Sequence, residues 1–132
     1  MRSALAVIAG YVTAVILVVV FFGIHAAIFG ARTAPGTAGS LVGLAWGVVT
    51  AIAGGWVTAR LAPSDPMRHA VWLITLSLTI GILFTWVIPL APEDARSLEP
   101  MWVQIGNLVV VVIGVPIGAR LIIRTREQCG ST

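Results

Sequence analysis

His25, Thr85, Gln104 and Asn107 are polar residues that interrupt long apolar stretches of this 132-residue sequence. Gln104 and Asn107 stand three positions apart, a spacing that puts both side chains on one face of a helix. In an apolar environment such groups form hydrogen bonds between helices, each contributing about 0.6 to 2 kcal/mol. Alternatively, they line a pocket for a solute or an ion. Both interpretations are open from the sequence, and both need elements that bring the residues to one depth.

Acid and base chemistry finds little support in the charged residues. Carriers that couple transport to protons or cations place a carboxylate inside a membrane span. In this chain all the acidic residues fall in expected loops or in the tail: Asp65, Glu93, Asp94, Glu99 and Glu127. This distribution argues against a small multidrug-type exchanger and against a proton-coupled pump.

Metal, haem and covalent chemistry are disfavoured as well. Cys129 is the only cysteine, which excludes an intrachain disulfide, a CxxC redox pair and a cysteine metal site. His25 and His69 lie about a membrane thickness apart, so they cannot share one haem iron within a monomer. The sequence has no HExxH pair, nucleophile elbow or phosphate-binding loop. We therefore predict a protein that is not an enzyme and holds no cofactor or metal, with His69 lying among lipid headgroups beside Arg68.

The composition indicates which elements hold these residues. The chain is 58% hydrophobic and 10% charged, with a mean hydropathy of +1.02, whereas a soluble domain is about 25% charged. A helix needs about 20 apolar residues to cross a bilayer, and the stretches of this length are residues 4–30, 39–61, 67–90 and 100–123. Short connections predict antiparallel neighbours. We expect an all-α fold, a four-helix transmembrane bundle in a single domain, whose first stretch is retained rather than cleaved as a signal peptide.

The arginines predict the orientation, because cytoplasmic loops accumulate basic residues. With the N-terminus inside, six arginines face the cytoplasm and two face outward. The six are Arg2, Arg60, Arg68, Arg120, Arg124 and Arg126, and the two are Arg32 and Arg96. Both termini are therefore expected in the cytoplasm, which places the four polar residues in the outer half of the bundle. Arginines that stand singly at the ends of apolar runs do not form a nucleic-acid-binding face.

Small residues recur at every fourth position of the second stretch. They are Gly39, Gly43, Gly47, Ala51 and Gly55, and we call them the small-residue stripe. The last stretch carries a shorter version, Gly114 and Gly118. Such stripes let helix backbones approach closely in a membrane. The partner is either another span of the same chain or a helix of a second chain.

Four short segments of the chain follow a pattern found in known proteins. Residues 54–63 read GGWVTARLAP and are soon followed by Arg68-His69-Ala70, while residues 100–104 read PMWVQ and residues 116–121 read PIGARL. Over 41–121 the chain resembles an uncharacterised family of small four-span bacterial inner-membrane proteins. That family usually has Tyr at the positions of Trp56 and Val103. The resemblance implies the four-span architecture and assigns no role to any residue.

The chain also contains a weak internal echo. Gly54 and the run Ala59-Arg60-Leu61 recur with the same spacing as Gly114 and the run Ala119-Arg120-Leu121. A duplicated pair of spans, as in some transporters, would produce this match. The positive-inside bias produces a small residue followed by Arg at a cytoplasmic helix end equally well.

The sequence therefore predicts a small multi-pass protein of the bacterial inner membrane with no enzymatic activity. The absence of lysine in a chain rich in Ala, Gly and Val supports a bacterial source. Its expected partners are the lipid bilayer and either further copies of itself, in a homo-oligomer, or the other subunits of a larger membrane complex. The alternative is a passive channel or small-solute facilitator lined by the polar cluster of the outer half.

Overall fold

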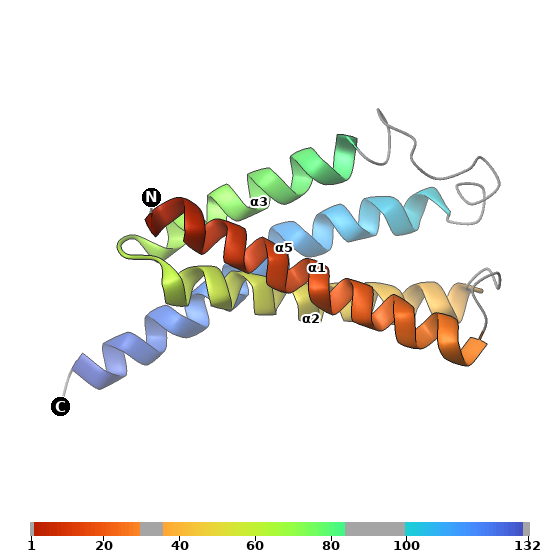
Figure 1. Ribbon diagram of the computed structural model, residues 1–132, viewed down its shortest axis with the longest axis horizontal. Coiled ribbons are helices and arrows are strands. Elements are labelled where there is room, and N and C mark those ends of the chain that lie inside the picture. Colours follow the sequence, from red (N-terminus) through yellow and green to blue (C-terminus); the bar gives the residue numbers. More distant parts are fainter. Residues whose placement is uncertain (1, 30–35, 84–99, 131–132) are drawn as a thin grey trace.

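The computed structural model describes residues 2–29, 36–83 and 100–130 of the chain. Within these residues the regular elements are helices, without a strand. In chain order they are α1 (Arg2–Phe29), α2 (Thr37–Leu61), α3 (Pro66–Ile82) and α5 (Met101–Gly130), shown in Figure 1. The described part is thus all-α, as the sequence predicts.

Three of the described helices are long and apolar enough to cross a membrane: α1, α2 and α5. A 25-residue helix such as α2 covers about 37 Å at 1.5 Å per residue, more than the ~30 Å hydrocarbon layer. Helix α3 is described for 17 residues. The outer part of the expected stretch 67–90 lies outside the described residues, so a fourth span stays a prediction.

The last helix is longer than its apolar stretch. The sequence predicts an end near residue 123, whereas α5 continues to Gly130 and includes Pro116 in its interior. A proline removes one backbone donor from the helical ladder, but the remaining turns keep α5 helical on both sides of it. The polar residues after 123 therefore extend the helix beyond the apolar run rather than forming a separate tail.

A short turn reverses the chain between α2 and α3. Pro63 forces the residue before it into an extended conformation, and Ala62 accordingly has φ −64° and ψ 125°. Asp65 adopts a left-handed conformation with φ 48°, which Asp tolerates better than most residues. Pro66 then starts α3 at a position where its missing N–H is not needed. The turn consequently sets α3 against the end of α2.

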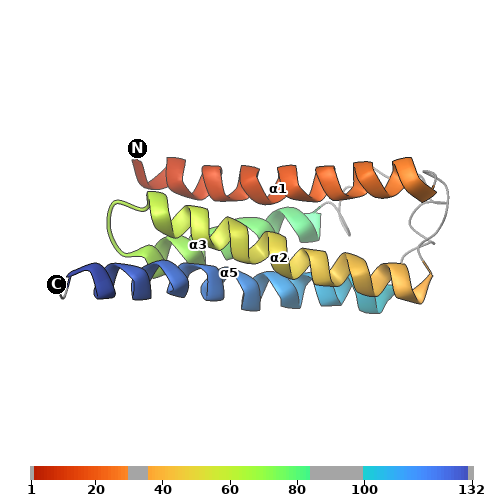
Figure 2. The same ribbon diagram turned by 90° about the horizontal axis from the view of Figure 1, so that it is seen from below.

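The helices form a rhombic bundle in which α2 contacts α1, α3 and α5. Helix α3 also contacts α1 and α5, whereas α1 and α5 do not pack on one another within the described residues. Figure 2 shows α1 and α5 on opposite sides of the layer formed by α2 and α3. In both views α2 and α5 run in the same direction, and α1 runs opposite to α2.

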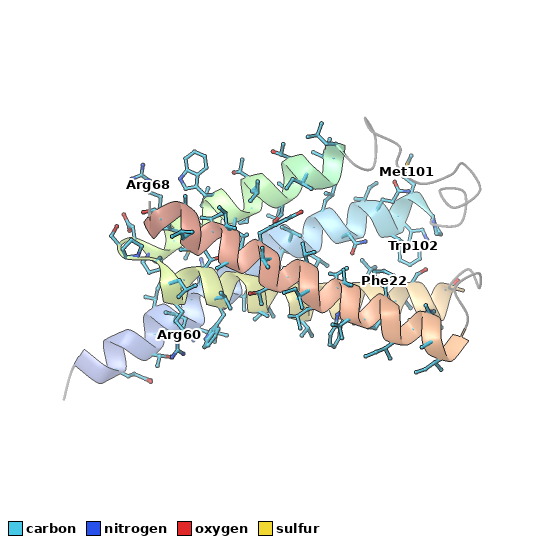
Figure 3. All side chains as sticks on the ribbon, in the orientation of Figure 1. Phe22, Arg60, Arg68, Met101 and Trp102 are labelled. Atoms are coloured by element: carbon cyan, nitrogen blue, oxygen red, sulfur yellow. The ribbon has the colours of Figure 1, made fainter. Side chains whose placement is uncertain are left out.

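Small side chains face inward and large apolar ones face outward. The buried core consists of Ala51, Ala59, Ala70, Leu73, Val115, Ala119 and Ile122. On α1, by contrast, Val19 is 63% exposed and Phe22, labelled in Figure 3, is 54% exposed. Lipid tails are as apolar as these side chains, so their exposure in a bilayer costs little, and the small interior lets the backbones come close.

Helix α1 meets α2 at a pair of glycines. A Cβ atom placed on Gly10 would overlap Thr58 Oγ1 and lie 2.6 Å from the carbonyl oxygen of Gly54. In the other direction, a Cβ placed on Gly54 would lie 3.0 Å from the carbonyl oxygen of Gly10. Each glycine Cα–H therefore points at the carbonyl of the other helix, the geometry of weak Cα–H···O bonds. Any larger residue here would push the helices apart.

A hydrogen bond farther along joins the same two helices. Trp46 Nε1 on α2 donates to the carbonyl oxygen of Leu17 on α1 across 3.1 Å. Its ring also stacks on Phe21, with centroids 5.3 Å apart and planes inclined by 15°. An indole N–H in an apolar layer needs an acceptor, and the α1 backbone supplies one. Trp46 thus fixes the rotation of α1 about its own axis.

The close approach at Gly10 predicts a difference between two glycines of α1. Gly10→Ala should lower the free energy of unfolding by about 1 to 3 kcal/mol, the usual range for overpacking. Gly23 has nothing within 4 Å of an added Cβ, so Gly23→Ala should leave stability unchanged or raise it by up to about 1 kcal/mol through helix propensity. Thermal unfolding in mild detergent measures both. Equal stability of the two variants would contradict the α1–α2 contact.

Candidate functional site

The part of the small-residue stripe near the C-terminal end of α2, Ala51 and Gly55, lies against α5. A Cβ placed on Gly55 would overlap the carbonyl oxygen of Val115 and lie 2.9 Å from Val115 Cα. From the other side, a Cβ on Gly118 would overlap the carbonyl oxygen of Ile52, and one on Gly114 would lie 2.7 Å from Ala51 Cβ. Backbone therefore touches backbone, and only glycine fits at these positions.

The α2–α5 contact also brings equivalent positions of the internal echo together. Gly55 and Val115 follow Gly54 and Gly114, the glycines that begin the two matching runs. The two residues touch directly, and their helices run in the same direction (Figure 1). A duplicated pair of spans with a local two-fold axis along the helices would give this arrangement. Duplication is compatible with the contact and stays a hypothesis.

The small-residue stripe leaves the α5 interface at Gly43. A Cβ on Gly47 would still meet α5, 3.4 Å from Asn107 Oδ1 and 3.5 Å from Val110 Cγ1, whereas one on Gly43 would meet nothing within 4 Å. Gly39 is partly exposed. The reason is helical geometry: residues four apart are turned by about 40° relative to one another. After three such steps Gly43 points about 120° away from the direction of Gly55.

Residues at alternating spacings of three and four continue the α5 contact instead. A Cβ placed on Gly106 of α5 would lie 3.0 Å from Leu44 Cδ2. Leu44 precedes Ala51 by seven residues and Gly55 by eleven, and both intervals are close to whole numbers of helical turns. The sequence therefore contained a signal for this face, the heptad-like spacing, which a search for every fourth small residue does not detect.

Those of the four polar residues that the structure describes lie on α1 and α5, which do not pack on one another within the described residues. Thr85 lies outside the described residues. His25, half-buried on α1, has its ring 6.3 Å from that of Phe21. Gln104 and Asn107 lie on α5, on the far side of the α2–α3 layer in Figure 2. A channel lined by the whole cluster stays a prediction.

Asn107 has a distinct environment. Its side chain is exposed, and its Oδ1 is the atom nearest to a Cβ placed on Gly47. The amide thus stands at the border between the α2–α5 contact and the lipid-facing surface. Gly43 has no side chain, and nothing described lies within 4 Å of a Cβ placed on it, so α2 presents its backbone there. We call Gly43, Gly47 and Asn107 the glycine–asparagine face.

A second feature, which the sequence analysis missed, is a cavity of about 550 Å³ between the beginning of α1 and the beginning of α3. Its polar lining comes from Ser3, Ser64, Asp65, Arg68 and His69, and its apolar lining from Ala4, Val7, Ile8, Trp72 and Leu76. The α3 members recur at intervals of three and four, which is one helix face. That spacing was visible in the sequence, but its juxtaposition with α1 was not.

The environment of His69 differs from the one that the sequence predicts. We expected a residue among lipid headgroups, whereas the side chain is only 6% exposed. Its Nδ1 lies 3.0 Å from the backbone carbonyl oxygen of Asp65, which also accepts the backbone N–H of Arg68 at 3.1 Å. The left-handed conformation of Asp65 holds this carbonyl over the first turn of α3 and draws the imidazole inward.

Charged side chains lie at the same end of the bundle as this cavity. Figure 3 shows Arg60 and Arg68 at this end and Met101 and Trp102 at the other. Arg60 is exposed in the last turn of α2, where a cation complements the helix dipole, and lies 5.0 Å from the ring centroid of Trp56. Among the described residues, no group of three or more His, Cys, Asp and Glu side chains could hold a metal ion.

Thr58 is the polar residue whose burial most needs an explanation. It is fully buried, and its Oγ1 has no hydrogen-bond partner within the described part of the chain. An unpaired buried hydroxyl costs about 1 to 3 kcal/mol. Its Oγ1 lies where a Cβ of Gly10 would stand, so it faces the Cα–H of that glycine and accepts at most a weak bond.

The α2–α5 contact predicts that alanine substitutions at two glycines of α5 lower the free energy of unfolding to different extents. Gly118→Ala would drive a methyl group into the Ile52 carbonyl and should cost about 1 to 3 kcal/mol of unfolding free energy. Gly106 meets only the flexible end of Leu44, so Gly106→Ala should cost less than about 1 kcal/mol. Denaturation in detergent, followed by circular dichroism, measures which variant loses more unfolding free energy. A smaller loss for Gly118→Ala than for Gly106→Ala would refute the backbone contact.

The comparisons with known proteins identify no relative of this chain. A scan against protein-family models found no match, and searches of curated proteins and of solved structures found none either. The resemblance described for residues 41–121 accordingly stays a prediction. The roles of the residues above follow from their contacts in this chain.

Proposed function

We propose that this chain is a non-enzymatic protein of the bacterial inner membrane that works by association, either with further copies of itself or as an accessory subunit of a larger membrane complex. The observation that supports this best is the glycine–asparagine face. There an amide, Asn107, is exposed close to Gly47, and one turn away along α2 a Cβ placed on Gly43 would meet no described atom within 4 Å.

An exposed amide beside bare backbone is an unfavourable surface to present to lipid. A polar side chain without a hydrogen-bond partner in hydrocarbon costs free energy, and each glycine lowers helix propensity by about 1 kcal/mol relative to Ala. A second helix against Gly43 and Asn107 offsets both costs. It places its backbone close to α2 and supplies a hydrogen-bond partner for Asn107, the combination by which membrane helices associate.

The glycines that pack inside the bundle support the same conclusion. Gly55, Gly114 and Gly118 already hold α2 and α5 together by backbone contact. Gly43 continues the same run but points elsewhere, since the stripe winds around α2. Near its C-terminal end α2 thereby packs Gly55 against α5 of its own chain. Near its N-terminal end it presents Gly43 to another helix.

Substitution at Gly43 tests association separately from folding. Gly43→Leu fills the glycine–asparagine face, and its Cβ enters open space, so the monomer should keep its stability while oligomers or bound partners are lost. Val49 is 49% exposed and points about 120° away from Gly43 around α2, and Val49→Leu is the matched control. Native mass spectrometry in mild detergent measures the assembly. A wild-type chain that is monomeric and brings no partner at fixed stoichiometry would contradict the proposal.

The same membrane placement predicts both termini in the cytoplasm. Arg60, Arg68, Arg120 and Arg124, whose positions the structure describes, belong to the six arginines assigned inside. A reporter that is active only in the periplasm should give no signal when fused to the C-terminus. It should give a signal when inserted between Asp94 and Ser97. The reverse pattern would show the opposite orientation.

A further inference from the structure

The cavity between α1 and α3 lies at the charged end of the bundle, where α2 ends and α3 begins. Its volume of about 550 Å³ falls within the range of roughly 300 to 1,000 Å³ typical of small-molecule sites. Ser64 and Asp65 come from the turn, Arg68 and His69 from the first turns of α3, and Ser3 from the start of α1. Polar groups thus meet at one rim.

The rim contains charges of both signs. Asp65 precedes α3 as its N-cap residue, yet its carboxylate makes no capping hydrogen bond, and its left-handed backbone differs from the extended conformation that capping residues usually adopt. The carboxylate is exposed and lines the cavity. Arg68, one turn along α3, is exposed and lines it too. A ligand here meets an anion and a cation at neighbouring positions.

His69 contributes an acceptor to the same rim. A carbonyl oxygen can only accept, so Nδ1 must donate to the Asp65 carbonyl at 3.0 Å. In the neutral imidazole the other nitrogen, Nε2, then has no proton and is itself an acceptor. Asp65 and His69 therefore suit a group with several N–H donors, while the fork of Arg68 suits a phosphate.

Beyond the rim the lining is apolar and open to the bilayer. Ile8 on α1 is 52% exposed and Trp72 on α3 is 58% exposed. Trp72 and Leu76 follow Arg68 at steps of four, so they lead along one face of α3 from the charged rim toward the apolar core. Tryptophan at this level is typical of the membrane interface. The cavity thus has one polar end and one lipid-like end.

We propose that this cavity binds a zwitterionic aminophospholipid, with its primary ammonium at Asp65 and His69, its phosphate at Arg68 and an acyl chain along Ile8, Trp72 and Leu76. A headgroup with a net negative charge has no cation to offset the Asp65 carboxylate: the hydroxyls of phosphatidylglycerol can donate to it, but its charge is repelled. A trimethylated ammonium has no N–H to donate. The site therefore distinguishes phosphatidylethanolamine from both phosphatidylglycerol and phosphatidylcholine. This site is independent of the glycine–asparagine face.

Lipid selectivity of the purified, delipidated full chain tests the proposal. Short-chain phosphatidylethanolamine, phosphatidylglycerol and phosphatidylcholine are added at equal concentrations, and bound lipid is measured by native mass spectrometry. We expect the ethanolamine lipid to bind about tenfold more tightly than either of the others, the effect of one charge-assisted hydrogen bond. Glycerophosphoethanolamine, which has no acyl chains, should not bind at these concentrations. Its equal binding would overturn the lipid assignment.

Two variants separate the charges of the rim. Asp65→Asn keeps the backbone carbonyl and a residue that tolerates the left-handed conformation, and it should abolish the preference for ethanolamine over choline. Arg68→Gln should weaken all phospholipids by about tenfold. Arg120→Gln, at an exposed position on α5 outside the cavity, is the control and should change neither.

Three further results would each overturn the proposal. They are equal binding of the three lipids by the wild-type chain, unchanged selectivity in Asp65→Asn, and a loss in Arg120→Gln as large as in Arg68→Gln. The wild-type comparison decides the question without any variant, so a folding defect in Asp65→Asn does not prevent the test. Thermal unfolding of each variant shows whether its fold is kept.

Discussion

Close contact between helix backbones is the constraint on which the rest of this bundle depends. In a bilayer no water is released when apolar side chains meet, so the helices need dispersion and weak polar contacts at short range. Gly10 and Gly54 provide them between α1 and α2, and Gly55 and Gly118 provide them between α2 and α5. Helix α2 is therefore central because two of its faces present glycines, each to a different neighbour.

This central contact determines what is left at the two ends of the bundle. At the charged end, the turn before α3 and the left-handed Asp65 bring α3 toward the beginning of α1, and a mixed polar and apolar cavity forms between them. At the other end Gly43 of α2 points away from α5, and Asn107 lies at the border of the exposed surface. We propose that the first end binds an amphiphile and the second a helix.

Sequence reasoning succeeded where the property depends on one segment at a time. The length of an apolar run decides whether a helix can cross a bilayer, and α1, α2 and α5 meet that requirement. It succeeded less well where helical phase matters. Small residues spaced by four suggested one continuous packing surface, but the pitch of 3.6 residues turns Gly43 away, and Leu44 meets α5 in its place.

The sequence by itself determined the helical class, the approximate ends of the apolar helices and the presence of glycines for close packing, because local composition and chain length suffice for each. Only the tertiary structure decided which helices are neighbours. It set α1 and α5 at opposite corners, which separates His25 from Asn107, and it placed Ser3 beside a cavity shared with Arg68. Such proximities arise because backbone contacts between distant segments fix how helices are arranged and rotated, and no local pattern encodes that arrangement.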